Sequence, residues 1–374
     1  YSTKLIRQFL TVLVAPGGAG KSTYILAVAM AMATGKPLLG EHVHKRSKVW
    51  LLNLEDPMEE LDRRIAAMMI QHSLTRAELD GWLFIHSGRD ERLIMTQMSD
   101  DGYSITYPHK KSITDIMIEH EIGVIIVDPF IKSNAGLEEN SNPHMDAAAT
   151  AWTEVAQAAN AASVVVHHTR KGAVSDIEAA RGAKSLTDAC RVGMTLSAMA
   201  QADAEAMGIK PEDSSRYIRV DDAKMNMAPK AEGATWFHMV SCNLGNATPE
   251  YPRGDNVAAL EAWQAPSPWD GLPMNRVVEI LERVVEGPDT GEQYTTAQTG
   301  PDKSRWIGAL LISLGGRTGA QAKIVLRDWA ANGVIVEGSY KSPGQRKTRL
   351  GVTVNAAKLE EFRKAASFPP NARD

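Results

Sequence analysis

The sequence lacks the features that mark several classes of protein. It contains two cysteines in 374 residues, Cys190 and Cys242, and their spacing fits no zinc site. No stretch approaches the roughly 18 consecutive apolar residues of a membrane-spanning helix, and no signal-peptide pattern is present. We therefore expect a protein of the reducing cytoplasm with no membrane partner. The chain begins almost on its first predicted strand, so a further segment could precede it.

The sequence also lacks a strong charge of either sign. Its 41 Lys and Arg and 45 Asp and Glu give a net charge of −4. The distribution is uneven, however, because residues 270–374 hold 15 basic and 12 acidic residues, a net of +3, which leaves −7 for residues 1–269. The length and the 44% hydrophobic content predict two or three domains with a sizeable core. The mildly basic C-terminal part indicates a nucleic-acid partner.

What the sequence does contain is a glycine-rich loop between a buried strand at 9–14 and a helix at 24–33. Loop glycines let several backbone N–H groups point at a polyphosphate, and the helix N-terminus adds partial positive charge. Lys21 would reach the β- and γ-phosphates of ATP, and the Ser22 hydroxyl would ligate Mg²⁺. A turn that only caps the helix is the alternative. The predicted nucleotide-binding residues are Pro16, Gly17, Gly18, Ala19, Gly20, Lys21, Ser22 and Thr23.

Polar side chains follow three further predicted strands, at 48–53, 123–127 and 163–166. Because carboxyl ends of parallel strands form the ligand edge of a sheet, Glu55 is a candidate general base and Asp128 a candidate Mg²⁺ ligand. His168 would contact the γ-phosphate or the attacking water. The alternatives are a solvated acidic turn for Glu55, a structural Asp128, and a strand end without function or a metal site for the histidine pair.

Strands and helices alternate through this region, which predicts an α/β fold with a mostly parallel sheet. The ordered motifs resemble those of RecA-fold ATPases of the RepA type, hexameric replicative helicases of plasmids, with related ATPases in phages and prophages. The resemblance covers roughly residues 1–245. It rests on residues 15–22, Leu54-Glu55-Asp56, Asp128, Glu139-Asn140, His167-His168, Lys171-Gly172, Arg181-Gly182, Asp188 and Arg191.

The resemblance implies a RecA-like P-loop ATPase core that binds ATP and Mg²⁺ between neighbouring subunits of a homo-oligomer, a hexamer. It also implies that Lys21, Glu55, Asp128 and His168 act within one subunit. Arg191 would be the arginine finger supplied to the neighbour, where it can be worth about 10³–10⁵ in rate. Arg181 is a second candidate for this role, and a surface arginine without function is the alternative for Arg191.

The last part of the chain predicts a different domain. Residues 246–273 are rich in proline and indicate a linker. Three helices and two strands within 274–365 resemble a small winged-helix domain, whose third helix and wing would bind DNA. A winged helix that binds protein, with solvated charges, is the alternative. The DNA-binding candidates are Lys323, Arg327, Lys341, Arg346, Lys347 and Arg349.

Three functions fit this pattern. The leading interpretation is a DNA-dependent motor ATPase, a ring-forming replicative helicase of a phage or mobile element acting on single-stranded or duplex DNA. The second is an ATPase that loads or remodels replication or recombination proteins on DNA. The third is an ATP-switched DNA-binding regulator without unwinding activity. An arginine supplied between subunits favours the two motors over the regulator.

Overall fold

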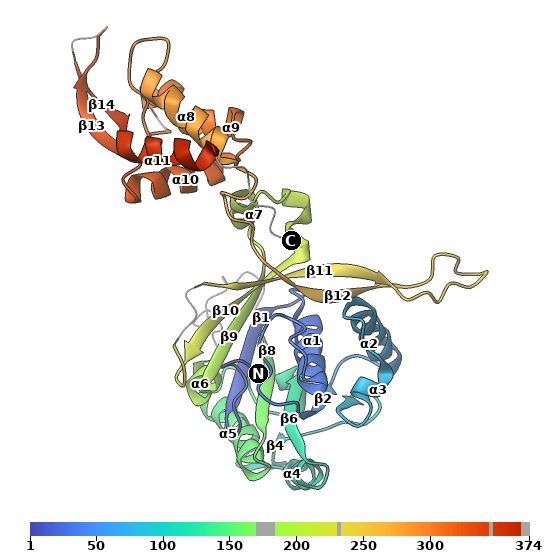
Figure 1. Cartoon of the computed structure of the whole chain (residues 1–374). Coiled ribbons are helices and arrows are strands. Elements are labelled where there is room, and N and C mark those ends of the chain that lie inside the picture. Colours follow the sequence, from blue (N-terminus) through green and yellow to red (C-terminus); the bar gives the residue numbers. More distant parts are fainter. Residues whose placement is uncertain (170–183, 230–232, 299, 344–346, 368–374) are drawn as a thin grey trace. The chain divides into compact units, whose positions relative to one another are not determined.

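The computed structural model describes residues 1–169, 184–229, 233–298, 300–343 and 347–367 (Figure 1). The chain divides into two compact units. The first unit contains residues 1–199 and 215–264, and the second contains residues 200–214 and 265–374. Within the described ranges, no helix is both long enough and apolar enough to span a membrane.

A nine-stranded sheet forms the centre of the first unit, with the order β12-β11-β10-β9-β1-β8-β6-β2-β3. The six strands from β9 to β3 are parallel, and β10, β11 and β12 extend the sheet with antiparallel pairs. The α/β class and the mostly parallel sheet are therefore confirmed. The strands are β1 (Leu10–Pro16), β2 (Lys48–Asn53), β3 (Leu83–Ser87), β6 (Ile122–Asp128), β8 (Ala162–Thr169), β9 (Val192–Ala198), β10 (Tyr217–Met225), β11 (Thr235–Asn243) and β12 (Asn256–Trp263).

Helices cover both faces of this sheet (Figure 1). Side chains of a β-strand alternate between the two faces, so Leu13 of β1 belongs to one apolar cluster and Val12 to the other. The first cluster includes α1 (Lys21–Thr34), α2 (Met58–Gln71) and α3 (Arg76–Leu79). The second includes α4 (Lys110–Glu119), α5 (Asn142–Ala158) and α6 (Lys184–Ala189).

A small second sheet lies in the same unit. It has the order β5-β4-β7, with the 3₁₀ helix η1 directly before β7. Strand β4 pairs antiparallel with β5 and parallel with β7. These elements are β4 (Thr96–Met98), β5 (Ile105–Thr106), η1 (Phe130–Ser133) and β7 (Asn134–Ala135).

The second unit has its own apolar core, which includes Ile280, Trp329 and Val352. From residue 265 onward, the α-helices α8, α9 and α10 precede an antiparallel β-hairpin, β13–β14, and the helix α11 follows it in the part of the chain that the structure describes. Helix α10 begins with a capping box between Thr318 and Gln321. The elements are α7 (Gln201–Met207), η3 (Pro211–Arg216), α8 (Met274–Glu286), η4 (Gly300–Arg305), α9 (Gly308–Ser313), α10 (Gly319–Ala331), β13 (Ile335–Lys341), β14 (Thr348–Val354) and α11 (Ala356–Ser367).

The structure corrects the prediction that all of residues 246–273 form a linker. Residues 256–263 form β12, the edge strand of the large sheet, paired with β11 over its whole length. The prolines that suggested a linker lie at 249 and 252 and then at 266, 268 and 273, so none interrupts the strand. Helix α2 also holds β12, since Gln71 donates to Glu261 and the His72 ring bonds the Leu260 carbonyl.

Candidate nucleotide site and nucleic-acid interface

The predicted site residues converge at the carboxyl edge of the parallel strands. Ala15, at the end of β1, is level with His168 at the end of β8. Asn53, at the end of β2, is level with both Asp128 and Ser87. The strand register therefore brings the P-loop, Asp128 and His168 to one edge, as the sequence predicted.

The glycine-rich loop has the backbone that only glycine adopts easily. Gly18 and Gly20 have positive φ angles of 76° and 92°. A Cβ atom on Gly20 would also lie 3.4 Å from side-chain atoms of Ile218 and Met239, on β10 and β11. Helix α1 begins immediately afterwards at Lys21, so its unpaired N–H groups face the loop.

Two buried ionisable residues of the site are Lys21, at the start of α1, and Asp128, at the end of β6. Lys21 is 5% exposed and donates from Nζ to the Pro16 carbonyl at 2.8 Å. Burial lowers the pKa of Lys21, and the charges of Asp128 and Glu55 act against this shift. Asp128 is 4% exposed, and burial raises its pKa while a hydrogen bond from the Ser22 hydroxyl lowers it. Serine and aspartate oxygens are ligands that Mg²⁺ prefers, so this pair fits the ion.

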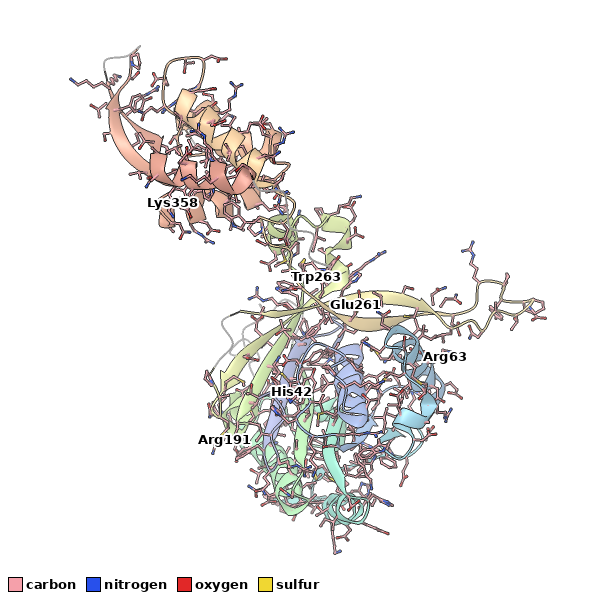
Figure 2. All side chains as sticks on the ribbon, in the orientation of Figure 1. His42, Arg63, Arg191, Glu261, Trp263 and Lys358 are labelled. Carbon is pink, nitrogen blue, oxygen red and sulfur yellow. The ribbon has the colours of Figure 1, made fainter. Side chains whose placement is uncertain are left out.

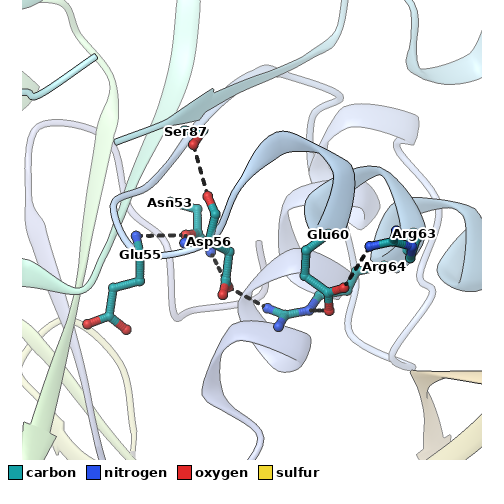
Figure 3. Close-up of polar contacts among 7 residues, drawn as sticks. All are labelled: Asn53, Glu55, Asp56, Glu60, Arg63, Arg64 and Ser87. Carbon is teal, nitrogen blue, oxygen red and sulfur yellow. Dashed lines mark hydrogen bonds and ion pairs between the residues drawn. The ribbon is translucent and has the colours of Figure 1, made fainter. Parts of the chain in front are cut away.

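Glu55 is held by its backbone rather than by its carboxylate. The Asn53 Oδ1 atom accepts the backbone N–H groups of Glu55 at 3.0 Å and Asp56 at 2.8 Å. Asp56 then pairs with Arg64, and Ser87 donates to the Asp56 carbonyl. Figure 3 shows the exposed Glu55 carboxylate directed away from the ion pairs of Asp56, Arg64, Glu60 and Arg63. The turn therefore fixes the backbone of Glu55 and leaves its carboxylate oxygens open to solvent.

The two histidines at the end of β8 have different surroundings. His167 is 6% exposed, and burial lowers its pKa to about 4. Its Nδ1 atom has no hydrogen-bond partner among the described residues, and its ring packs edge-on against Phe130. His168 is half-buried, and its pKa is lowered, mainly by burial and also by the positive charge of Lys21. The negative charges of Glu55, Asp128 and Glu139 act in the opposite direction. His168 thus shares one electrostatic environment with the other site residues, and the described residues contain no metal-ligand cluster around the pair.

Arg191 lies away from this edge. It is exposed and directly precedes β9, where its N–H donates to Leu10 at the amino end of β1 (Figure 2). The neighbouring pair Thr11 and Val192 fixes that register. Since β1 runs for seven residues at about 3.3 Å each, Arg191 is on the order of 20 Å from the P-loop of its own subunit. Arg181 lies outside the described residues.

A cavity of about 660 Å³ joins the candidate residues to parts of the chain that sequence reasoning missed. It is lined by Gly18, Lys21, Ser22, Glu55 and His168. Further lining residues lie on α2 and at or directly before the start of β12, and they include Arg63, Arg64, Asp255, Asn256, Val257 and Ala258. Arg63 and Asp255 are ion-paired at 3.4 Å. Only the absence of proline from 256–263 could have indicated a strand there.

Part of the chain is similar to a known protein family. Residues 2–174 match the protein family described as an AAA domain, a range that contains the P-loop, Glu55, Asp128 and His168. The first unit thus combines a glycine-rich phosphate-binding loop with the mostly parallel α/β sheet expected of a RecA-like core, and part of it is similar to that family. The chain is also similar to two solved structures, each at 12% identity and a TM-score of 0.45. One is the ATPase domain of G40P, with 64% of this chain and 83% of that chain covered. The other is a DnaB-like replicative helicase described with its interactions with primase, with 63% and 56% covered.

The cations predicted to bind DNA have unequal surroundings in the second unit. Lys323 and Arg327 are exposed one turn apart on α10, and Lys341 and Lys347 are exposed on the β13–β14 hairpin. Arg349 is different, because it pairs with Glu292 at 3.4 Å and its side chain is 21% exposed. Arg346 lies outside the described residues. The exposed lysines are therefore the better candidates for phosphate contacts.

Proposed function

We propose that this chain is a Mg²⁺-dependent, DNA-stimulated motor ATPase that works as a ring, in the manner of the RepA-type replicative helicases. The observation that supports this most is the division of the site residues between two edges of one sheet. Lys21, Ser22, Asp128 and His168 meet at the carboxyl edge, whereas Arg191 lies at the amino edge. In this proposal, one subunit alone does not supply all of the catalytic side chains.

The residues of the carboxyl edge have distinct roles in this proposal. The loop N–H groups and Lys21 bind the β- and γ-phosphates of ATP, and Ser22 and Asp128 would hold Mg²⁺, which neutralises phosphate charge when bound. The Glu55 carboxylate takes a proton from the attacking water, and the Asn53 side chain holds the Glu55 backbone at the ligand edge. His168 contacts the γ-phosphate or that water, so its environment changes on hydrolysis.

Arg191 completes the site of a neighbouring subunit. An arginine brought to the transferred phosphoryl group stabilises charge that develops in the transition state. Ring closure would place the amino edge of one subunit near the carboxyl edge of the next, because such interfaces are heterologous. We propose six subunits by resemblance to the RepA-type helicases.

The second unit is the proposed DNA-binding part. We assign its three helices and hairpin to a winged-helix arrangement, with α10 as the recognition helix and β13–β14 as the wing. Lys341 and Lys347 would contact phosphates without reading sequence. The exposure of these lysines and the net charge of +3 over residues 270–374 support this assignment.

Mixing two inactive variants tests the shared site. Lys21→Ala removes the phosphate contact and Arg191→Ala removes the finger, so each protein alone should be inactive. Mixed rings contain interfaces with an intact lysine and an intact arginine, and ATPase activity should reappear with a maximum near equal amounts. The measurement is ATPase rate against mixing ratio, with and without single-stranded DNA. Strand displacement on a forked duplex is measured in parallel.

The outcomes separate the three functions. Rescue with strand displacement supports the helicase. Rescue and DNA-stimulated turnover without displacement favours an ATPase that loads or remodels other proteins on DNA. No rescue at any ratio, from variants shown to co-assemble, contradicts the shared site and leaves the ATP-switched regulator.

A further inference from the structure

Residues 200–214 leave the first unit and belong to the second. They connect β9 to β10, which are neighbouring antiparallel strands of the large sheet. Ala198 pairs with Ile218, and the Met199 N–H donates to the Tyr217 carbonyl at 2.9 Å. Two residues would suffice to join strands in this register. The chain instead forms α7 and most of η3, and these pack within the compact unit that contains α10.

The contacts of this segment are made with the first turn of α10. The Thr318 hydroxyl, which caps α10, donates to the Glu205 carbonyl at 2.9 Å. Gly208 ends α7 with a φ of +73°, and a Cβ atom there would lie 3.0 Å from the Gln321 amide nitrogen. Gln321 is 7% exposed, and Ala204 of α7 is fully buried. The segment is therefore docked on α10 by packing as well as by one hydrogen bond.

The charge of the segment is opposite to that of the helix it covers. Residues 200–214 contain Asp203, Glu205, Glu212 and Asp213 against the single Lys210, a net of −3. A cavity of about 800 Å³ between segment and helix is lined by residues that include Glu205, Lys210 and Lys323. Lys323, a DNA-binding candidate, thus lines the same cavity as Glu205 and Lys210 of the segment, whose net charge as a whole has the sign of a phosphate backbone.

We infer that residues 200–214 occupy the nucleic-acid face of α10 and compete with duplex DNA for it. This inference rests on the proposed function, since it requires the second unit to bind DNA. In a helix-turn-helix domain the N-terminal residues of the recognition helix contact base edges in the major groove. That end of α10 is the end that α7 covers. DNA binds through α10 once the acidic segment has moved away, and through the wing alone while the segment stays docked.

The loss of DNA affinity depends on the fraction of molecules in which the segment is released from α10. Apparent affinity falls in proportion to the fraction of molecules in the competent state. A segment docked in about 90–99% of molecules would therefore weaken binding through α10 by about 10- to 100-fold.

Two variants release the segment by different means. The first replaces residues 200–216 by Asn-Gly, a turn that suits the paired Met199 and Tyr217. The second is Gly208→Val, which strains a left-handed backbone and pushes against Gln321 without changing charge. Its matched control is Gly245→Val, at a similar φ of +69° but with no atom within 4 Å of its Cβ position. Affinity for a labelled duplex is measured by anisotropy on the full chain.

Both release variants should bind duplex DNA at least 10-fold more tightly than the parent protein. The control Gly245→Val should bind duplex DNA with the affinity of the parent. Adding Lys323→Glu to the shortened variant should then remove most of this gain, because the exposed helix is what binds. Parent-like affinity in both release variants, with the parent binding DNA, would overturn the inference and leave the proposed function intact. If neither the parent nor any correctly folded variant binds duplex DNA, both this inference and the proposed DNA-binding function would be overturned.

Discussion

The charged residues of the two units differ in how the fold surrounds them. Lys21 and Asp128 are 5% and 4% exposed, and each has a hydrogen-bond partner, the Pro16 carbonyl for Lys21 and the Ser22 hydroxyl for Asp128. Lys341 and Lys347 of the second unit are exposed on a hairpin. The first pair lies where water is largely excluded and the second where water and salt have free access.

This difference decides how each set can act. A charge in a low-dielectric site interacts strongly with its neighbours, so one substitution there changes the whole site. Exposed cations are screened by salt and contribute independently, so their effects are small and roughly additive. The P-loop edge therefore suits chemistry, and the hairpin suits sequence-independent attraction.

The largest expected effect is at the P-loop edge. Lys21→Ala should abolish nucleotide binding or turnover, because no other cation of the loop can reach the phosphates. Glu55→Gln should keep ATP binding while slowing hydrolysis by about 10²–10⁴-fold, since only activation of the water is lost. ATP affinity and turnover are measured for both. The control is Glu59→Gln, an exposed acid in the first turn of α2. Normal turnover in Glu55→Gln would exclude Glu55 as the base.

A smaller effect is expected from the buried His167. Its pKa of about 4 lies below the ordinary value of 6.5, so the unfolded chain binds more protons between these values. The stabilisation is thus complete above pH 6.5 and is lost as the pH falls toward 4. At pH 5 the loss is about 2 kcal/mol.

His167→Phe keeps a ring against Phe130 and should reduce this loss. The measurement is the urea concentration at which β8 amides lose protection from hydrogen exchange, at pH 7 and pH 5. An equal pH dependence in parent and variant would contradict the assignment to His167.

The smallest effect per residue is expected on the hairpin. Lys341→Ala and Lys347→Ala should each weaken duplex binding a few-fold for all sequences and lower the salt dependence by about one unit of slope. Arg349→Ala should change DNA affinity less, because its guanidinium pairs with Glu292. Duplex affinity is titrated against salt for the three variants. An equal loss in all three would show that exposure does not select the DNA-binding cations.

Local sequence determined the elements that carry the site. Residues 48–53 were predicted as a strand with the bounds that the structure has. The glycines of the P-loop and the polar residues after three buried strands were enough to predict one ligand edge, because parallel strands end together. Each of these signals depends on residues that are close in the chain, which is why a single sequence contains them.

Tertiary structure decided the features that depend on contacts between distant residues. The strand at 256–263 is stabilised by pairing with β11 and by the hydrogen bond from Gln71, at the end of α2, to Glu261. The prolines on both sides of it made the sequence indicate a linker instead. The ion pair between Arg349 and Glu292 joins residues 57 positions apart in the sequence. The hydrogen bond from Thr318 of α10 to Glu205 of α7 joins residues 113 positions apart. The hydrophobic pattern of a sequence does not predict such contacts, because they depend on which surfaces of the helices and strands remain uncovered once each has formed.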